Sequence, residues 1–335
     1  MGQRANLVVV KDNTYDLYYS HWCANTLPKD LFWGEQYAIQ FIEMQTRVDE
    51  SGWLDDVWAE GGAVLDVDKK KLVFYGGEDI LYNIPLRNLY LKLLRKIWYG
   101  WEIDWAYEGI VDLADYVGYP REKVLKSREE DVNDTGLAPP EERDWVDTVA
   151  SVAYSEDEIL LFPLYGGVEV YLSDGPKMID KINKSYGYKT LSLSEWSQEF
   201  PVGGFHLDLK MRRLEFWHAY DLPNLSEQLS VKWSDWEVID HYGNYELQCK
   251  RTDGRLLFQR VDQRQLLETL KGLLLKESSN PLDAIAYIVN KEADAGRTVE
   301  ISPYALRYDR YELPRNVKEE ILDYAINQLS YREEP

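Results

Sequence analysis

The feature that most constrains the fold of this chain is an internal repeat. Residues 61–79 align with residues 203–221 without a gap. Both copies begin with Gly-Gly, continue with Leu-Asp and end with Leu-x-Phe-aromatic and a final Asp. The pattern Trp-x-x-Trp-Glu follows each copy, at Trp98–Glu102 and at Trp233–Glu237. A gap-free match of this density predicts that one folding unit is present twice.

Each copy has the residue pattern of a β-hairpin that is followed by a helix. In the first copy, Ala63–Val67 and Leu72–Tyr75 are rich in strand-forming residues, and a turn-like Asp-Lys-Lys sequence joins them. Leu86–Trp98 then carries apolar residues at helical spacing on one face and basic residues on the other. The fold class we expect is α+β, with internally duplicated ββ-α-ββ-α units, antiparallel sheets and C-terminal helices that cover an edge.

The expected domain boundaries follow from composition. The stretch around Pro139-Pro140 combines turn-forming residues with few apolar side chains, which is typical of a linker. We therefore expect a first α+β repeat at 1–125, a linker at 126–148, a second α+β repeat at 149–262 and a C-terminal helical segment at 263–335.

The second half of the chain adds three further expectations. The residue pattern predicts a hairpin that joins Ile159–Phe162 to Val168–Leu172, and strands between Trp236 and Gln259. The four histidines are scattered without metal-ligand spacing, and only His206 and His218 fall where a hairpin would bring two of them together. We therefore expect no metal site and no obligatory cofactor.

Charge and composition limit the classes of partner. The 335 residues include 59 acidic and 38 basic side chains, which give a formal net charge of −21. Such a charge opposes binding to nucleic acid or to an anionic membrane, because both need clustered Lys and Arg. Two cysteines make no disulfide framework, and no apolar run has the length of a membrane span. We expect a soluble, cytoplasmic protein of bacterial type.

The N-terminal sequence carries a second recognisable pattern. Gly2, Arg4, Asn6, His21 and Trp22 match a group of uncharacterised bacterial proteins that begin MG-x-R-x-N and continue with a hairpin and a His-Trp pair, and the chain resembles that group. It is also similar to Ntn-like folds, in which an arginine near the N-terminus and a first hairpin line a substrate pocket. Those hydrolases need Cys, Ser or Thr at the new N-terminus, and removal of Met1 here exposes Gly2 instead.

The stretch Trp53–Asp79 is crowded with carboxylates and indoles. Its glycines, Leu-Asp pair and aromatic residues recur in the second copy and are most simply part of the scaffold. Any function special to this stretch therefore rests on the residues that do not recur, which are Asp55, Asp56, Trp58, Glu60 and Glu78. Acids beside indoles are typical of carbohydrate clefts. The candidate binding residues are Trp22, Asp55, Asp56, Trp58, Trp101 and Trp105.

Two functions are compatible with these patterns. The first is a non-catalytic, acidic binding or regulatory protein of an intracellular bacterial module, with a protein partner. The alternative is a hydrolase, Ntn-like in fold but without the usual nucleophile, with a pocket between the N-terminal hairpin and Trp53–Asp79. Its candidate catalytic residues are Arg4, His21, Glu60 and Glu78, and Cys23 lies close enough to His21 in sequence to form a nucleophilic pair with it. Convergence of these side chains in one pocket would favour the hydrolase.

Overall fold

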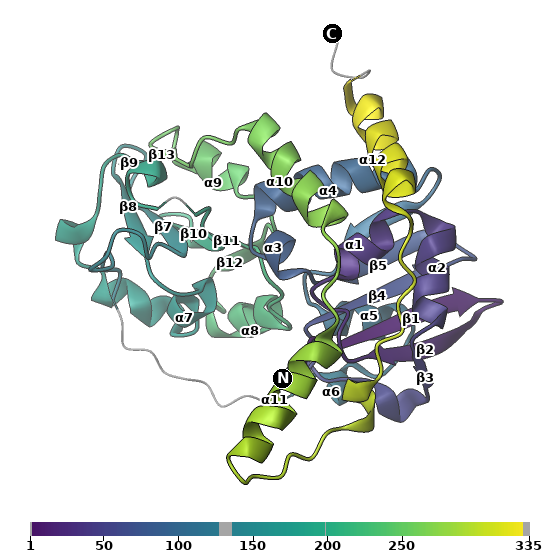
Figure 1. The fold of residues 1–335 in the computed structure, drawn as a ribbon. Coiled ribbons are helices and arrows are strands. Elements are labelled where there is room, and N and C mark those ends of the chain that lie inside the picture. The colour runs from purple at the N-terminus through teal and green to yellow at the C-terminus, as the bar shows by residue number, and fades with distance from the viewer. Residues whose placement is uncertain (1, 127–135, 198, 331–335) are drawn as a thin grey trace. The chain divides into compact units, whose positions relative to one another are not determined.

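The computed structural model describes residues 2–126, 136–197 and 199–330, and it divides into two compact units (Figure 1). Unit 1 comprises Met1–Ile80, Leu86–Lys126 and Gln263–Pro335, and unit 2 comprises Leu81–Pro85 and Ser127–Asp262. The helical segment that begins at residue 263 therefore belongs with the first repeat, and most of unit 2 is inserted between Lys126 and Gln263. Residues 127–135 of the expected linker lie outside the described residues.

Unit 1 contains, in its described residues, a six-stranded mixed sheet with the order β3-β2-β1-β4-β5-β6. The hairpins β1-β2 and β4-β5 are antiparallel, whereas β1 pairs with β4, and β5 with β6, in parallel. The strands are β1 (Ala5–Lys11), β2 (Thr14–Ser20), β3 (Thr46–Val48), β4 (Gly61–Asp66), β5 (Lys71–Tyr75) and β6 (Glu102–Trp105). The helices before residue 127 are α1 (Leu27–Phe32), α2 (Glu35–Glu43), η1 (Glu50–Gly52), α3 (Glu78–Leu81), α4 (Ile84–Ile97), α5 (Ile110–Tyr116) and α6 (Arg121–Val124). The helices from residue 263 onward are α10 (Gln263–Leu275), α11 (Pro281–Asp294), η5 (Pro303–Leu306) and α12 (Arg315–Ser330).

Unit 2 contains, in its described residues, a five-stranded mixed sheet with the order β12-β11-β10-β7-β8 and a short pair β13-β9. The strands are β7 (Thr148–Ala153), β8 (Ile159–Leu164), β9 (Leu191–Ser192), β10 (Gly203–Asp208), β11 (Arg213–His218), β12 (Glu237–Asp240) and β13 (Leu256–Leu257). The helices are α7 (Val168–Leu172), η2 (Gly175–Lys181), η3 (Lys184–Tyr186), η4 (Leu193–Glu195), α8 (Leu225–Lys232) and α9 (Glu246–Arg251).

The two units share one topology. Read from one side, the strands β2-β1-β4-β5-β6 of unit 1 correspond to β8-β7-β10-β11-β12 of unit 2, with the same parallel and antiparallel pairs. The α+β class is thus confirmed, with a duplicated core. The expected antiparallel pairing holds within each hairpin, and parallel pairs join the hairpins into mixed sheets.

The repeated Trp-x-x-Trp-Glu pattern has the same geometry in both units. Its two indoles lie 4.9 Å apart at 82° in the first copy, and 5.0 Å apart at 80° in the second. The glutamate that follows them pairs with Lys71 in unit 1 and with Arg213 in unit 2, at 2.7 Å in each case. The motif is therefore a structural element that fixes the strand at one edge of each sheet.

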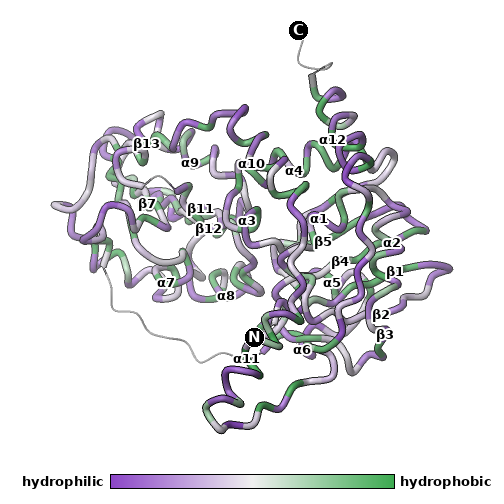
Figure 2. Tube along the Cα trace, viewed as in Figure 1, coloured by the Kyte–Doolittle hydropathy of each residue, from purple (hydrophilic) through white to green (hydrophobic). Residues whose placement is uncertain are grey.

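The second glycine of each Gly-Gly pair is explained by a helix that crosses the sheet closely. A Cβ atom added at Gly62 would lie 2.6 Å from the Leu113 side chain on α5, and one added at Gly204 would lie 2.5 Å from Gln248 on α9. Strands β4 and β7 are buried along their whole length. The hydropathy of each residue along the chain is shown by colour in Figure 2. Close helix–sheet packing is thus common to both units.

Three expectations for the second repeat are wrong in detail. The run Val168–Leu172 is helix α7, and β8 forms its hairpin with β7 instead. The region between Trp236 and Gln259 contains helix α9 as well as short strands. His206 lies opposite Glu215 in the hairpin register, and His218 lies opposite Gly203, so the two histidines are not cross-strand partners.

The C-terminal segment packs back on unit 1. Helix α10 contacts α1 and α12, and Gln45, just before edge strand β3, donates to the Asp309 carbonyl at 3.1 Å. None of the helices in the described part of the chain combines the length and hydrophobicity that crossing a membrane requires.

Candidate functional site

The strongest candidate site in unit 1 is the loop of residues 53–60, which we call the clamped loop. Asn6 on β1 is fully buried and holds the start of this loop with both ends of its amide. Its Nδ2 donates to the Gly52 carbonyl at 3.0 Å, and its Oδ1 accepts from the Leu54 backbone N–H at 2.7 Å. A buried amide with both ends bonded fixes the backbone that it touches.

Arg4 holds the other end of the clamped loop. Its backbone N–H donates to the Glu60 carboxylate at 2.7 Å, and its carbonyl accepts from the Glu60 N–H at 2.9 Å. Its guanidinium carbon lies 4.6 Å from the centre of the Trp58 ring, which is a cation–π contact. Because residues two apart share one face of an extended segment, Arg4 and Asn6 reach the same loop.

Two carboxylates shape the loop from within. Asp55 Oδ1 accepts from the backbone N–H groups of Val57 and Trp58, at 3.1 and 3.2 Å. Asp56 Oδ1 accepts from the Lys126 N–H at 2.7 Å. Both aspartates therefore help to hold the loop in place.

The result is a rigid loop with an exposed apolar tip. Val57 and Trp58 are 52% and 53% exposed, although the backbone around them is bonded at both ends. At the base of the loop, Trp53 stacks on Tyr119 with ring centres 5.2 Å apart. A fixed, half-exposed indole is the shape of an anchor that a partner surface can enclose.

The clamp is built from unit 1 residues, and one of its bonds recurs in the described part of unit 2, where the Val202 N–H donates to the Asp147 carbonyl at 2.8 Å. The register of β1 against β4 and of β7 against β10 places Ala5 where Thr148 lies. Arg4 therefore corresponds to Asp147 and Asn6 to Val149, so the residues that hold the clamped loop are replaced. The side-chain contacts of the clamp are therefore a specialisation of unit 1, whereas the backbone bond between Glu60 and Arg4 belongs to the duplicated scaffold.

His21 lies beside this site but is largely buried. Its Nδ1 is 2.9 Å from the Tyr19 hydroxyl, and the Arg4 side chain reaches the same hydroxyl. Cys23 is also buried, and burial raises the pKa of its thiol to about 12. The thiol is therefore protonated at neutral pH, and a Cys23–His21 nucleophilic pair has no support.

The remaining sequence candidates lie elsewhere in unit 1. The Glu78 carboxylate accepts from the Asn25 amide at 3.3 Å, at the start of α3. The Trp22 indole donates to the Ala305 carbonyl, and the Trp101 indole donates to Glu35. Trp105 is buried beneath the Arg87 guanidinium. Trp105 on edge strand β6 and Trp101 just before it lie far across the sheet from β2, which Trp22 follows, so the candidate indoles do not form one stacking platform.

Two cavities near these residues do not unite the hydrolase candidates. A cavity of about 240 Å³ is lined by the Gln3, Asn25, Lys29 and Asp79 side chains and by α10. A much smaller one, of about 10 Å³, includes His21 in its lining. Arg4, Glu60 and Glu78 line neither cavity.

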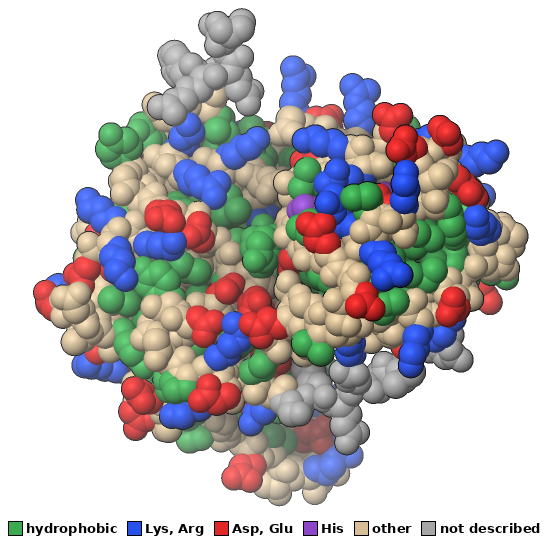
Figure 3. Space-filling model, turned by 180° about the vertical axis from the view of Figure 1, so that it is seen from behind, with side chains coloured by type: hydrophobic (Ala, Val, Ile, Leu, Met, Phe, Trp, Pro, Cys, Tyr) green, Lys and Arg blue, Asp and Glu red, His purple; other side chains and the backbone are tan. Residues whose placement is uncertain are grey.

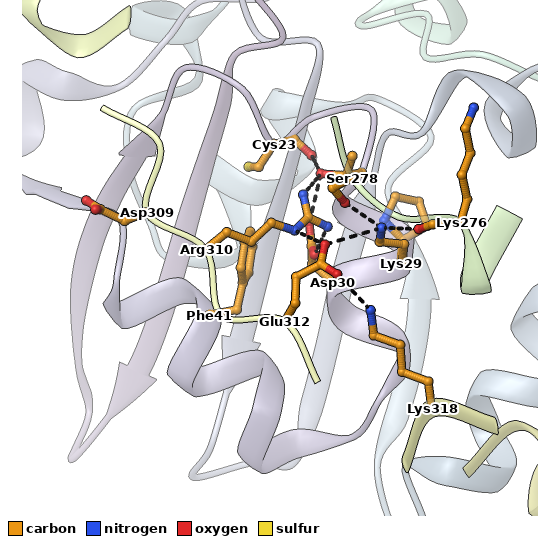
Figure 4. Close-up of polar contacts among 12 residues, drawn as sticks. Cys23, Lys29, Asp30, Phe41, Lys276, Ser278, Asp309, Arg310, Glu312 and Lys318 are labelled. Atoms are coloured by element: carbon orange, nitrogen blue, oxygen red, sulfur yellow. Dashed lines mark hydrogen bonds and ion pairs between the residues drawn. The ribbon is translucent and has the colours of Figure 1, made fainter. Parts of the chain in front are cut away.

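We call residues 303–313 the C-terminal strap. A buried ionic cluster lies between this strap and α1, and the sequence analysis does not predict it (Figure 4). Arg310 pairs with Asp30 and donates to the Thr26 hydroxyl at 3.1 Å. Glu312 lies 3.2 Å from both Arg310 and Lys318. Despite Arg310, burial raises the pKa of Asp30 to about 6. Arg310 and Asp30 are 280 residues apart in the sequence, so no local sequence pattern indicates that they are in contact.

Comparisons with known proteins do not place the chain in a protein family. No protein-family model matches the chain, and no curated protein or solved structure is significantly similar to it. Within residues 2–126, 136–197 and 199–330, no group of three or more His, Cys, Asp or Glu side chains is arranged to hold a metal ion. The clamped loop must therefore be interpreted from its own geometry.

Proposed function

We propose that this protein is a non-catalytic binding protein that regulates a protein partner in the bacterial cytoplasm, and that the clamped loop is its recognition site. The observation that carries the proposal is Trp58. Its indole is 53% exposed, yet Arg4 lies over its ring and Asp55 caps its backbone N–H. Tryptophan is enriched among interface anchors, and a loop already held in place loses less entropy on binding.

The charge of the chain supports a basic partner. A formal net charge of −21 attracts cationic surfaces over long distances and accelerates encounter. On the face shown in Figure 3, acidic and basic side chains of the described residues are interspersed and do not form one broad acidic region. Charge would then steer the partner, and the apolar tip of the clamped loop would anchor it.

The cysteines support a cytoplasmic location. Cys23 and Cys249 are both free thiols, which fits a reducing compartment. Burial raises the pKa of both thiols, so neither is readily oxidised.

The test is differential capture of partners. Tagged wild-type chain, Trp58→Ala and Trp145→Ala are each incubated with lysate of the host bacterium, and bound proteins are quantified by mass spectrometry. Trp145 is the matched control, because it is also 53% exposed but lies in unit 2. We expect a protein that binds wild type and Trp145→Ala equally and binds Trp58→Ala about 30-fold more weakly.

A second readout checks the charge argument. Capture by the wild type should fall as salt is raised, because screening removes the long-range attraction. Identical capture by all three proteins would contradict the proposal, as would copurification of a tightly bound small molecule with no protein partner.

A hydrolase at the N-terminal hairpin is the second candidate. The observation in its favour is that the Arg4 and His21 side chains both contact the Tyr19 hydroxyl. If this candidate is correct, the purified chain turns over an ester or amide substrate and His21→Gln abolishes turnover while the chain stays folded. Turnover that survives in His21→Gln would exclude His21 as the base.

A further inference from the structure

A buried polar layer lies in unit 2 between the sheet and α9. Ser151, His206 and Glu215 occupy adjacent positions on β7, β10 and β11, because the register places His206 opposite both of the others. The three residues are 0%, 4% and 3% exposed. Gln248 and Arg251 on α9 cover them, and these five residues are called the polar layer below.

The polar layer ties α9 to the sheet through hydrogen bonds. The Ser151 hydroxyl lies 2.8 Å from His206 Nδ1, and Gln248 Nε2 donates to the same hydroxyl at 3.0 Å. Gln248 also accepts from the Trp217 indole at 2.7 Å. Arg251 donates to both oxygens of Glu215, at 2.6 and 2.7 Å.

The same place in unit 1 is apolar. The shared topology and strand register put Val8, Val64 and Val73 where Ser151, His206 and Glu215 lie. Leu113 packs against the second glycine there, as Gln248 does in unit 2. The duplicated fold is therefore stable with an apolar layer at this position. Burying polar groups instead is costly unless all are paired, which indicates that the polar layer serves a purpose beyond the scaffold.

We propose that the polar layer is an acid-sensitive latch, which holds α9 on the sheet while His206 is neutral and releases it when His206 is protonated. The charged groups that face His206 are Glu215 on β11, Asp208 on β10 and Arg251 on α9. Both oxygens of Glu215 are already engaged by Arg251, and His241 lies 3.3 Å from one of them. Glu215 and Asp208 favour a protonated imidazole and Arg251 opposes it, but burial away from water outweighs the two carboxylates, so the closed layer disfavours protonation.

The sign of the pH effect follows from the environment of His206. Burial lowers its pKa to about 4, against an ordinary value of 6.5. When α9 lifts and water reaches the ring, the open state binds a proton more readily than the closed one. The contribution of neutral His206 to closure is therefore fully present above pH 6.5 and is lost as the pH falls toward 4. Linkage predicts that the open fraction of α9 rises about 30-fold between pH 7.5 and pH 5.

The test is hydrogen exchange of the full chain, with the α9 amides followed at pH 7.5 and pH 5 after correction for intrinsic exchange. We expect wild type to show the rise of about 30-fold in α9, while the α5 amides of unit 1, over the valine layer, serve as an internal reference without it. His206→Asn keeps a polar group near the Ser151 hydroxyl but does not titrate, so it should show no rise.

Two further variants separate the latch from a general loss of stability. His241→Asn is the matched control, because His241 also faces Glu215 but lies outside the layer, and it should retain the wild-type rise. Arg251→Gln removes the cation that opposes a protonated His206, so its rise should be smaller. An unchanged α9 in wild type, or an equal rise in His206→Asn and wild type, would overturn the proposal.

Discussion

Replacing Arg310 with methionine should destabilise unit 1 by about 3–5 kcal/mol, because it leaves the Asp30 carboxylate buried without its cation. The Arg310 and Asp30 side chains are 7% and 6% exposed. Residual contacts to the Thr26 hydroxyl cannot replace a guanidinium. Chemical denaturation, with hydrogen exchange of β1 and β4 as the local probe, measures the loss.

A double variant and a surface control make this prediction specific. Asp30→Leu combined with Arg310→Met should recover most of the lost stability, since an apolar pair replaces a buried ion pair at little cost. Arg297→Met removes an exposed ion pair to Glu292 on α11 and should leave stability unchanged. If the double variant is as unstable as Arg310→Met, loss of packing and not the unpaired charge is responsible.

The Arg310→Met variant should lose less stability at acidic pH than at neutral pH. Burial already raises the pKa of Asp30 to about 6 in the wild type, and loss of Arg310 removes an attraction that lowers it. At pH 5 the variant can bind a proton on Asp30, whereas at pH 7.5 it must keep the charge buried. The destabilisation should therefore be smaller at pH 5 than at pH 7.5.

The repeat could be recognised from sequence because both units need the same residues at the same places of one shared topology. The Gly-Gly pair, the Leu-Asp turn and the Trp-x-x-Trp-Glu pattern keep the same residues at the same spacing in both copies, although the second glycine and the first tryptophan contact residues far away in sequence. The sequence of Val168–Leu172 predicts a strand wrongly because four of its five residues are β-branched, aromatic or aliphatic, and so short a run fits a strand as well as a buried helix.

Some residues of the candidate site could be predicted from the sequence, but their roles could not. Arg4, Trp58 and Glu60 do lie together, as an N-terminal motif and a non-recurring loop suggested. The roles of Asp55 and Asp56 depend on which backbone N–H groups they face, and that is set by a turn whose geometry no spacing reveals. The Arg310–Asp30 pair joins segments from the two ends of the chain, and only tertiary structure brings them together.

Replacing Trp98 or Trp233 with alanine should cost about 3–5 kcal/mol in each case, with the loss confined to the unit that carries the change. The two indoles are 2% and 0% exposed. Trp98 donates to the Leu31 carbonyl at 3.0 Å, and Trp233 donates to the Leu172 carbonyl at 2.9 Å. Since each bond joins the strand connection to the first helix of its unit, the two substitutions remove the same volume and the same contact.

Phenylalanine variants separate these contributions. Trp98→Phe and Trp233→Phe keep most of the ring but leave a buried carbonyl without its donor, which should cost about 1–3 kcal/mol. Hydrogen exchange of β5 and β11 reports each unit by itself. Trp58→Ala, at an exposed position, should change stability by less than about 0.5 kcal/mol. Equal losses of stability in the two units would show that both copies of the motif contribute equally to folding. A clear inequality would mean that one copy of the motif contributes less to the stability of its unit.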